Sequence, residues 1–165
     1  MTAVVRAGVI TVSDRGSRGE REDISGNVVR ELLEELPAEV AAVRMVADEE
    51  DLIARAIVEL IDEEKLDLVV TTGGTGVSPR DVTPDATRGI IHREIPGMAE
   101  EMRRESLKKT PHAMISRAIV GIRNQSIIIN LPGSPKGARE NLSALMPSLM
   151  HALEKVRGDQ SDCAS

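Results

Sequence analysis

The chain has 165 residues, a net charge of −6, a single cysteine (Cys163) and no Phe, Tyr or Trp. This length favours one domain with its own core, which we expect to span residues 1–157 and to leave a flexible tail at 158–165. The charge argues against a nucleic-acid surface, and the lack of aromatic side chains argues against stacking of single-stranded bases. The sequence has no signal peptide, no apolar run long enough to span a membrane and no cysteine pair, so we expect a cytoplasmic protein.

Segments typical of strands and helices alternate along the chain. Strands are expected at 3–12, 40–46, 66–72, 118–122 and 126–131. Helices are expected at 27–36, along an apolar stripe at 52–61, near 84–89, at 98–108 and from Pro135 onward. Such alternation is typical of a mainly parallel sheet with helices on both faces. The predicted fold class is therefore α/β, a three-layer α/β/α sandwich with a mostly parallel sheet.

Four polar segments each follow a predicted strand, at 13–25, 48–50, 73–81 and 132–136. Ligands of parallel sheets bind beyond the carboxyl ends of the strands. We therefore expect these four segments to gather at one edge of the sheet and to form the ligand site there.

The segment after the strand at 66–72 is the most informative part of the chain. It contains three close glycines and then an arginine and a carboxylate, and its candidate binding residues are Gly73, Gly74, Thr75, Gly76, Ser78 and Arg80. Main-chain N–H groups exposed between a strand and a helix suit a phosphate. The segment lacks the Lys-Ser/Thr pair of a P-loop and the third glycine of the dinucleotide motif. A tight connection would explain the glycines alone equally well, but Arg80 and Asp81 favour a phosphate site.

Two aspartates are the candidate catalytic and metal-binding residues. Asp48 follows the strand at 40–46, where it can either cap the next helix or bind a metal. Asp81 would supply a second carboxylate from the glycine segment. Because Mg²⁺ binds one or two carboxylates together with phosphate oxygens, Asp48 and Asp81 are the predicted metal ligands of a nucleotide site.

Further candidates lie at two other strand ends. Ser13 and Asp14 end the first strand, and Gly133, Ser134 and Lys136 precede the last helix. Ser134 can cap that helix or donate to a phosphate, and Lys136 can neutralise a phosphate or remain in solvent.

Two smaller inferences concern the loop at 13–25 and the ligand itself. Asp23 or Ser25 could cap the helix at 27–36, and for Ser25 capping is favoured over a role in the site. A ring bound among these loops would have to lie against aliphatic side chains, main-chain planes, or an Arg or His, because the chain has no Phe, Tyr or Trp.

Together these motifs resemble the MoaB/Mog family of molybdenum cofactor biosynthesis proteins over roughly residues 5–155. The most specific match is 72–76 followed by 80–87, supported by 13–15, 23–26, 131–136 and by Pro96-Gly97 with Glu100 and Arg103. The resemblance implies a molybdopterin adenylyltransferase, which transfers AMP from ATP to molybdopterin with Mg²⁺ and releases pyrophosphate. By position, Asp48 and Asp81 match the essential acidic residues of the family, and 73–76 matches its nucleotide loop.

The resemblance also implies partners. It favours a homo-oligomer, a trimer rather than a hexamer, and contact with a molybdenum-insertion protein. The alternative is a family member that binds molybdopterin with little or no adenylyltransferase activity. Another nucleotide enzyme on this fold and a purely structural scaffold are the remaining candidates.

Overall fold

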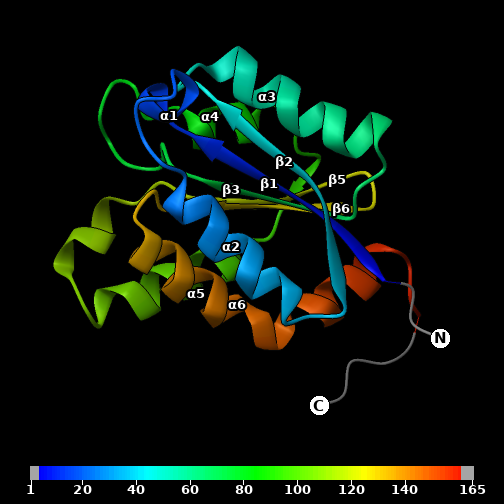
Figure 1. The fold of residues 1–165 in the computed structure, drawn as a ribbon. Helices are drawn as coiled ribbons and strands as arrows, with labels where there is room; N and C mark the ends of the chain where they lie inside the picture. The colour runs from blue at the N-terminus through cyan, green and yellow to red at the C-terminus, as the bar shows by residue number, and fades with distance from the viewer. Residues whose placement is uncertain (1–3, 161–165) are drawn as a thin grey trace.

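The structure, a computed structural model, describes residues 4–160 as a six-stranded sheet with helices on both faces (Figure 1). The strand order is β2-β1-β3-β6-β5-β4. The strands are β1 Val5–Val12, β2 Ala38–Val46, β3 Leu68–Thr72, β4 Arg93–Glu94, β5 Val120–Arg123 and β6 Ser126–Leu131. The first four strands in this order are parallel, whereas β5 and β4 pair antiparallel at one edge. The predicted α/β class with a mostly parallel sheet is confirmed.

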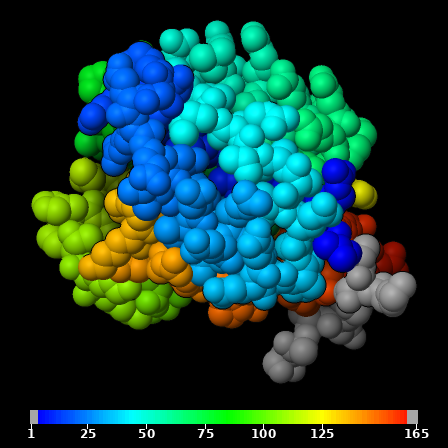
Figure 2. Space-filling model, viewed as in Figure 1, coloured from blue at the N-terminus to red at the C-terminus, as the bar shows by residue number. Residues whose placement is uncertain are grey.

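The helices form the two outer layers (Figure 1). Helices α2 (Ile24–Glu34), α5 (Pro96–Leu107) and α6 (Pro135–Val156) cover one face of the sheet. Helices α3 (Glu50–Val58) and α4 (Thr83–Arg88) cover the other face, and α3 continues into a π-helical turn, η1 (Glu59–Glu63). Two short elements, α1 (Asp14–Ser17) and the 3₁₀ helix η2 (Pro111–Ile115), lie in the connections. In the space-filling view the orange start of α6 lies between blue α2 and yellow-green α5 (Figure 2).

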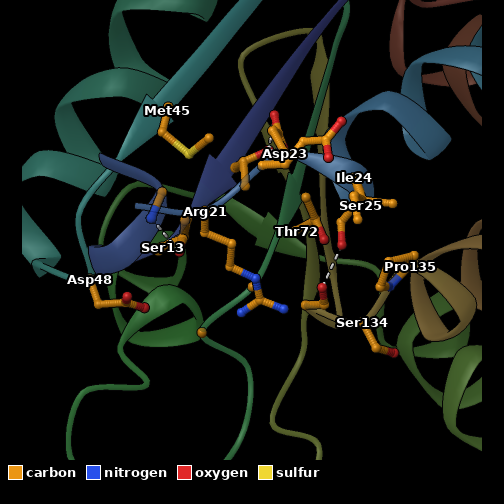
Figure 3. A pocket seen from close by; sticks show the side chains of 17 residues that line it. Ser13, Arg21, Asp23, Ile24, Ser25, Met45, Asp48, Thr72, Ser134 and Pro135 are labelled. Atoms are coloured by element: carbon orange, nitrogen blue, oxygen red, sulfur yellow. Dashed lines mark hydrogen bonds between the residues drawn. The ribbon is translucent and has the colours of Figure 1, made fainter. Parts of the chain in front are cut away.

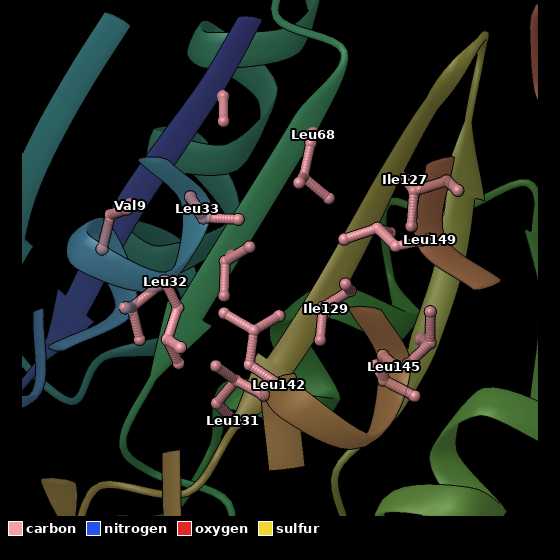
Figure 4. Close-up of a cluster of buried hydrophobic side chains, with 14 of the residues drawn as sticks. Val9, Leu32, Leu33, Leu68, Ile127, Ile129, Leu131, Leu142, Leu145 and Leu149 are labelled. Atoms are coloured by element: carbon pink, nitrogen blue, oxygen red, sulfur yellow. The ribbon is translucent and has the colours of Figure 1, made fainter. Parts of the chain in front are cut away.

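The strands bury both faces, so the core has two halves. In β6, Ile127 and Ile129 pack toward α2 and α6, whereas Ile128 between them packs toward α3 and α4. Figure 4 shows the first half, where Leu142 and Leu145 of α6 reach toward the sheet. Full burial of one such side chain contributes about 1.5–3 kcal/mol. An entirely aliphatic core therefore supports the sheet edge on which the loops sit.

Several element boundaries differ from the sequence expectations. Helix α2 begins at Ile24, three residues before the expected 27, and β5 runs over Val120–Arg123 rather than 118–122. Strand β4 and helix η2 were not predicted at all. Residue 3, the expected start of the first strand, lies outside the described residues, as does most of the tail expected at 158–165. No helix within residues 4–160 is both long enough and apolar enough to cross a membrane.

Candidate active site

The four polar segments meet at the carboxyl edge of the parallel strands. The N–H of Ser13 donates to the last carbonyl of β2 over 2.9 Å, and the N–H of Gly73 donates to the Leu131 carbonyl over 3.0 Å. The Ser25 hydroxyl donates to the Gly133 carbonyl over 2.5 Å, across 108 positions of sequence. Together with the hydrogen bonds between Asp14 and Asp48, these bonds bring the segments at 13–25, 48–50, 73–81 and 132–136 to one surface, as the parallel topology predicts.

A cavity of about 390 Å³ opens at this edge (Figure 3). Its walls come from the end of β1 and the following loop, from β2 and Asp48, from Thr72 to Gly74, and from Gly133 to Pro135. The predicted site residues that line this one hollow are Ser13, Asp48, Gly73, Gly74, Gly133 and Ser134.

Asp14 and Asp48 are linked by two hydrogen bonds, each from the main-chain N–H of one residue to the carboxylate of the other. The Asp14 N–H donates to Asp48 Oδ2 over 2.8 Å, and the Asp48 N–H donates to Asp14 Oδ1 over 2.9 Å. Arg80 holds the same Asp14 carboxylate with Nε–Oδ2 and Nη2–Oδ1 distances of 3.1 and 2.9 Å. The Asp48 side chain is thus not a helix cap: α3 has Glu49 at its N-cap position, without a side-chain capping bond.

The segment at 73–81, called the glycine segment below, begins with a backbone conformation that only glycine adopts readily. Gly73 and Gly74 have φ of 106° and 68°. A Cβ on Gly73 would overlap the Val12 carbonyl oxygen, and one on Gly74 would lie 2.5 Å from Thr83 Oγ1 and 3.2 Å from Asp48 Oδ1. The glycines therefore bring the main chain directly against Asp48.

Asp81 is the last residue of the same segment, and its carboxylate lies beside Gly76. Its Oδ2 accepts the Ser78 N–H over 3.0 Å, and a Cβ on Gly76 would lie 2.9 Å from that oxygen. The Asp81 charge is also close enough to act on Asp48. The two aspartates therefore face Gly76 and Gly74 of one loop, although Asp81 does not line the cavity that contains Asp48.

A second hollow of about 350 Å³ adjoins the first. It is lined by Thr75, Gly76, Ser134 and Lys136, together with side chains of α5 and η2. Ser134 lines both hollows. Of the described residues predicted for the site, Asp14, Ser78, Arg80 and Asp81 line neither hollow.

The helix caps settle one alternative that the sequence left open and give Ser134 a structural role. Asp23, not Ser25, caps α2: its Oδ1 accepts the Gly26 N–H over 2.9 Å and the Thr11 hydroxyl over 2.9 Å. The expectation that Ser25 acts as a cap was wrong, because its hydroxyl donates to the Gly133 carbonyl instead. Ser134 caps α6 by accepting the Gly137 N–H over 3.0 Å.

Arg117 organises the glycine segment, and the sequence analysis missed it. Its Nε donates to the Gly76 carbonyl over 2.8 Å, its Nη2 donates to the Asp81 carbonyl over 2.6 Å, and both Nη atoms bind the Asp85 carboxylate. Its main-chain N–H donates to the Thr75 carbonyl over 2.8 Å. Because a carbonyl and the next N–H point in opposite directions across a trans peptide, the N–H groups that follow Thr75 and Gly76 face away from Arg117.

Arg21 is a second residue that the sequence analysis missed. It belongs to the loop between α1 and α2, and its side chain lines the first cavity. Figure 3 shows it extending between Ser13 and Asp48 on one side and Ser25 and Ser134 on the other. A charged residue in a loop of many charges carried no spacing signal that could have identified it.

Burial and hydrogen bonding at this edge shift the pKa values of two carboxyl groups in opposite directions. Burial raises the pKa of Asp48 above its ordinary value, and the charges of Asp14 and Asp81 add to this effect. Hydrogen bonding from Arg80 lowers the pKa of Asp14. A half-buried carboxylate of raised pKa near other acidic groups is a feature of functional sites.

The carboxylates suit a cation that completes its coordination with ligand oxygens. Within residues 4–160 no group of three or more His, Cys, Asp or Glu is placed to hold a metal. This donor set does not fit a metal bound by protein atoms alone. It does fit Mg²⁺, which is held by one or two carboxylates together with phosphate oxygens and water.

Comparison with known proteins gives the family. A family model for a probable molybdopterin binding domain matches residues 8–151. The chain belongs to this family. The molybdopterin adenylyltransferase of Helicobacter pylori strain J99 is 46% identical over 158 residues, covering 94% of this chain and 89% of that protein. The Escherichia coli K12 protein of the same name is 42% identical over 144 residues, covering 86% and 73%.

A solved family structure has the same fold. The crystal structure of the molybdopterin biosynthesis enzyme MoaB from Thermus thermophilus matches with a TM-score of 0.89 at 52% identity, covering 94% of this chain and 98% of that one. The family membership predicted from the motifs is thus confirmed.

Proposed function

We propose that this chain is a molybdopterin adenylyltransferase of molybdenum cofactor biosynthesis. An oxygen of the molybdopterin phosphate forms a bond to the α-phosphorus of ATP, and the bond from that phosphorus to the bridging oxygen breaks. Adenylyl-molybdopterin and pyrophosphate are the products. The relatives named molybdopterin adenylyltransferase, at 42–46% identity over most of the chain, support this reaction.

The observation that carries the proposal is the placement of Asp48 and Asp81 against one glycine segment. Oδ1 of Asp48 faces Gly74, and Oδ2 of Asp81 faces Gly76. A triphosphate bound along this segment would have a carboxylate at each end. A molybdopterin-binding protein without turnover has no need of this pair of acidic side chains.

The protein's part in this reaction is positioning and charge stabilisation, which account for most of the catalysis of phosphoryl transfer. The attacking phosphate is already an anion, so no strong base is needed to activate it. The N–H groups of Gly74, Thr75 and Gly76 would hold phosphate oxygens. Ser134 and Lys136 would contact a phosphate from the start of α6, with Lys136 acting as a point charge.

Asp48 and Asp81 would hold Mg²⁺. When bound, Mg²⁺ supplies positive charge that offsets the negative charge of the phosphates. Arg80 would serve in a different way from the one expected, because in this structure it is paired with Asp14. We propose that Arg80 and Asp14 fix Asp48 and the glycine segment relative to each other, and that Ser13, Ser78 and Gly133 complete the binding edge.

A turnover assay tests the proposal. The protein is incubated with ATP, Mg²⁺ and molybdopterin, and the products are identified by mass together with pyrophosphate release. Formation of adenylyl-molybdopterin is the expected result. Tight molybdopterin binding without any pyrophosphate would instead establish the alternative, a binding protein with little or no transferase activity.

Three further expectations accompany this function. A homo-oligomer, with a trimer favoured over a hexamer, is expected from the family resemblance, as is contact with a molybdenum-insertion protein. A cytoplasmic location follows from the expected use of ATP. Size determination in solution and co-purification with an insertion protein are the corresponding measurements.

A further inference from the structure

Arg21 is an exposed cation on the wall of the first cavity, and no described residue neutralises it. Arg80 is paired with Asp14, Arg18 with Glu20 and Arg117 with Asp85, whereas Arg15 of α1 has no such partner in the described part of the chain but does not line the cavity. Among residues 4–160, Arg21 has neither a hydrogen-bond acceptor nor an ion-pair partner. Its side chain nevertheless extends into the cavity rather than away from the protein (Figure 3).

Apolar side chains share this cavity with Arg21. Ile24 is 53% exposed, and it lines the cavity together with Met45. Ile24 begins α2, directly after the loop of Arg21, and Met45 lies in β2. The cavity therefore offers apolar surface beside a planar guanidinium group, and this combination suits a flat ring better than a free anion.

The composition of the chain gives this arrangement its significance. With no Phe, Tyr or Trp in 165 residues, a flat ligand ring has no aromatic side chain of these kinds to lie against. The three histidines, His92, His112 and His151, do not line this cavity. The guanidinium group of arginine is planar, is weakly hydrated and stacks on aromatic faces. Arg21 is thus the planar side chain available inside the cavity.

We propose that Arg21 stacks on a planar heteroaromatic ring of a substrate, either the adenine of ATP or the pterin of molybdopterin. This inference rests on the proposed function only for the identity of the two rings. Arg21 takes the place of the aromatic residue that the chain lacks, and Ile24 or Met45 contacts the ring from another side. Arg21 is therefore a residue for ring recognition, separate from the main-chain groups that would bind phosphate.

Three substitutions separate stacking from charge. Arg21→Lys keeps the charge and loses the plane, Arg21→Tyr keeps a plane and loses the charge, and Arg21→Met loses both. All three should fold, because the Arg21 side chain makes no bond within the described chain. The matched control is Arg18→Met, which removes the same charge from the same loop at a side chain that is 57% exposed and paired with Glu20 outside the cavity.

The experiment measures equilibrium binding of ATP, tripolyphosphate and free pterin to the five proteins. Tripolyphosphate carries the charge of ATP without a ring, so the ratio of the two affinities reports the ring contact. We expect Arg21→Lys and Arg21→Met to lower the affinity for ATP or for pterin by about 5- to 30-fold, which is the range of one stacking contact. Arg21→Tyr and Arg18→Met should bind that probe as the unaltered protein does, and the weakened probe tells which ring is bound.

Other results would overturn the inference. If Arg21→Lys binds normally while Arg21→Tyr and Arg21→Met bind weakly, Arg21 is a phosphate contact. If the unaltered protein binds ATP no better than tripolyphosphate and does not bind pterin, no ring is recognised in this cavity. The turnover assay stays independent: normal adenylyl transfer with unchanged binding in all variants would leave the proposed function intact and remove the stacking role.

Discussion

Asp14 and Asp48 each accept the main-chain N–H of the other, over 2.9 and 2.8 Å, although 34 positions separate them in the sequence. The exchange joins the end of β1 to the end of β2 and turns Oδ1 of Asp48 toward Gly74. Because both N–H groups are satisfied by side chains, the two strand ends are fixed without a main-chain bond between these residues. The predicted metal ligand Asp48 is thus held in place by a second carboxylate that is itself paired with Arg80.

The first prediction concerns Asp48→Asn. It should lower adenylyl transfer by about 100-fold or more, the size of one lost electrostatic contact in the transition state. It should also raise the Tm at pH 7–8. Burial raises the pKa of Asp48 in the folded protein, so the folded state binds more protons between the ordinary value of 3.8 and the raised one, and stability falls as pH rises through this window.

A pH series of thermal unfolding curves checks the sign. The rise in Tm caused by Asp48→Asn should be complete above the raised pKa of Asp48 and should vanish as the pH falls below about 3.8. Asp62→Asn is the matched control with the opposite sign, because hydrogen bonding from Arg123 lowers the pKa of Asp62. That variant should be destabilised at neutral pH, and a destabilised Asp48→Asn under the same conditions would contradict the account.

The second prediction concerns Arg117→Lys. A lysine keeps the charge but cannot reach the Gly76 and Asp81 carbonyls and both oxygens of Asp85 together. Because the glycine segment then loses its support, we expect the KM for ATP to rise about 10-fold. Steady-state kinetics with varied ATP measures this change.

Arg123→Lys is the matched control for this substitution. Arg123 also binds an aspartate with two bonds and one carbonyl, namely Asp62 and Ile90, at the opposite end of the sheet. Both variants should lose stability to a similar extent, but only Arg117→Lys should change the KM for ATP. An equal rise in both variants would mean that Arg117 acts on stability alone.

The third prediction compares two glycines. Gly73→Ala forces a φ of 106° on a residue with a side chain and places its Cβ against the Val12 carbonyl oxygen. We expect a loss of more than about 2 kcal/mol in the free energy of unfolding. Gly97→Ala in the first turn of α5 meets nothing within 4 Å and should stabilise by about 0.5–1 kcal/mol. Urea unfolding of both variants gives the comparison, and similar values for the two would contradict the close approach at Gly73.

The fourth prediction concerns Lys136→Met. Lys136 is 83% exposed and lies 4.0 Å from Glu140, so its removal should change the free energy of unfolding by less than about 0.5 kcal/mol. If it contacts a phosphate, ATP or molybdopterin affinity should fall by about 2- to 10-fold, and less at high salt. Lys108→Met, which removes a lysine paired with Glu105 on α5, is the control and should leave the affinity unchanged. Equal affinities for the two variants would remove Lys136 from the site.

The sequence was sufficient for the parts of the fold that depend on local pattern. The run Ile127-Ile128-Ile129 identifies a strand buried on both faces, and strands followed by helices place the polar loops at one edge. It did not reveal β4, because two exposed residues at Arg93–Glu94 carry no alternation. It also did not indicate that β5 runs antiparallel, since the pattern predicted strands at 118–122 and 126–131 without their relative direction.

The site shows the same limit at the level of side chains. The glycines and Asp48 were identified from their places after strands, but the partner of Asp48 was not, because a contact across 34 positions depends on how two loops approach each other. Ser25 and Asp23 carry the same capping signal, and only tertiary contacts decide which of them caps α2. The carbonyl contacts of Arg117 likewise arise from tertiary packing, and no local motif predicts them.

The central claim is that Asp48 and Asp81 act on one nucleotide. The most direct test is the affinity of the protein for ATP with Mn²⁺ in place of Mg²⁺, measured by electron paramagnetic resonance for Asp48→Asn, Asp81→Asn and the double variant. Two ligands of one metal couple, so each single variant should lose most of the affinity and the double variant little more than either one. Losses that simply add, or a single variant that binds as tightly as the unaltered protein, would contradict the shared site.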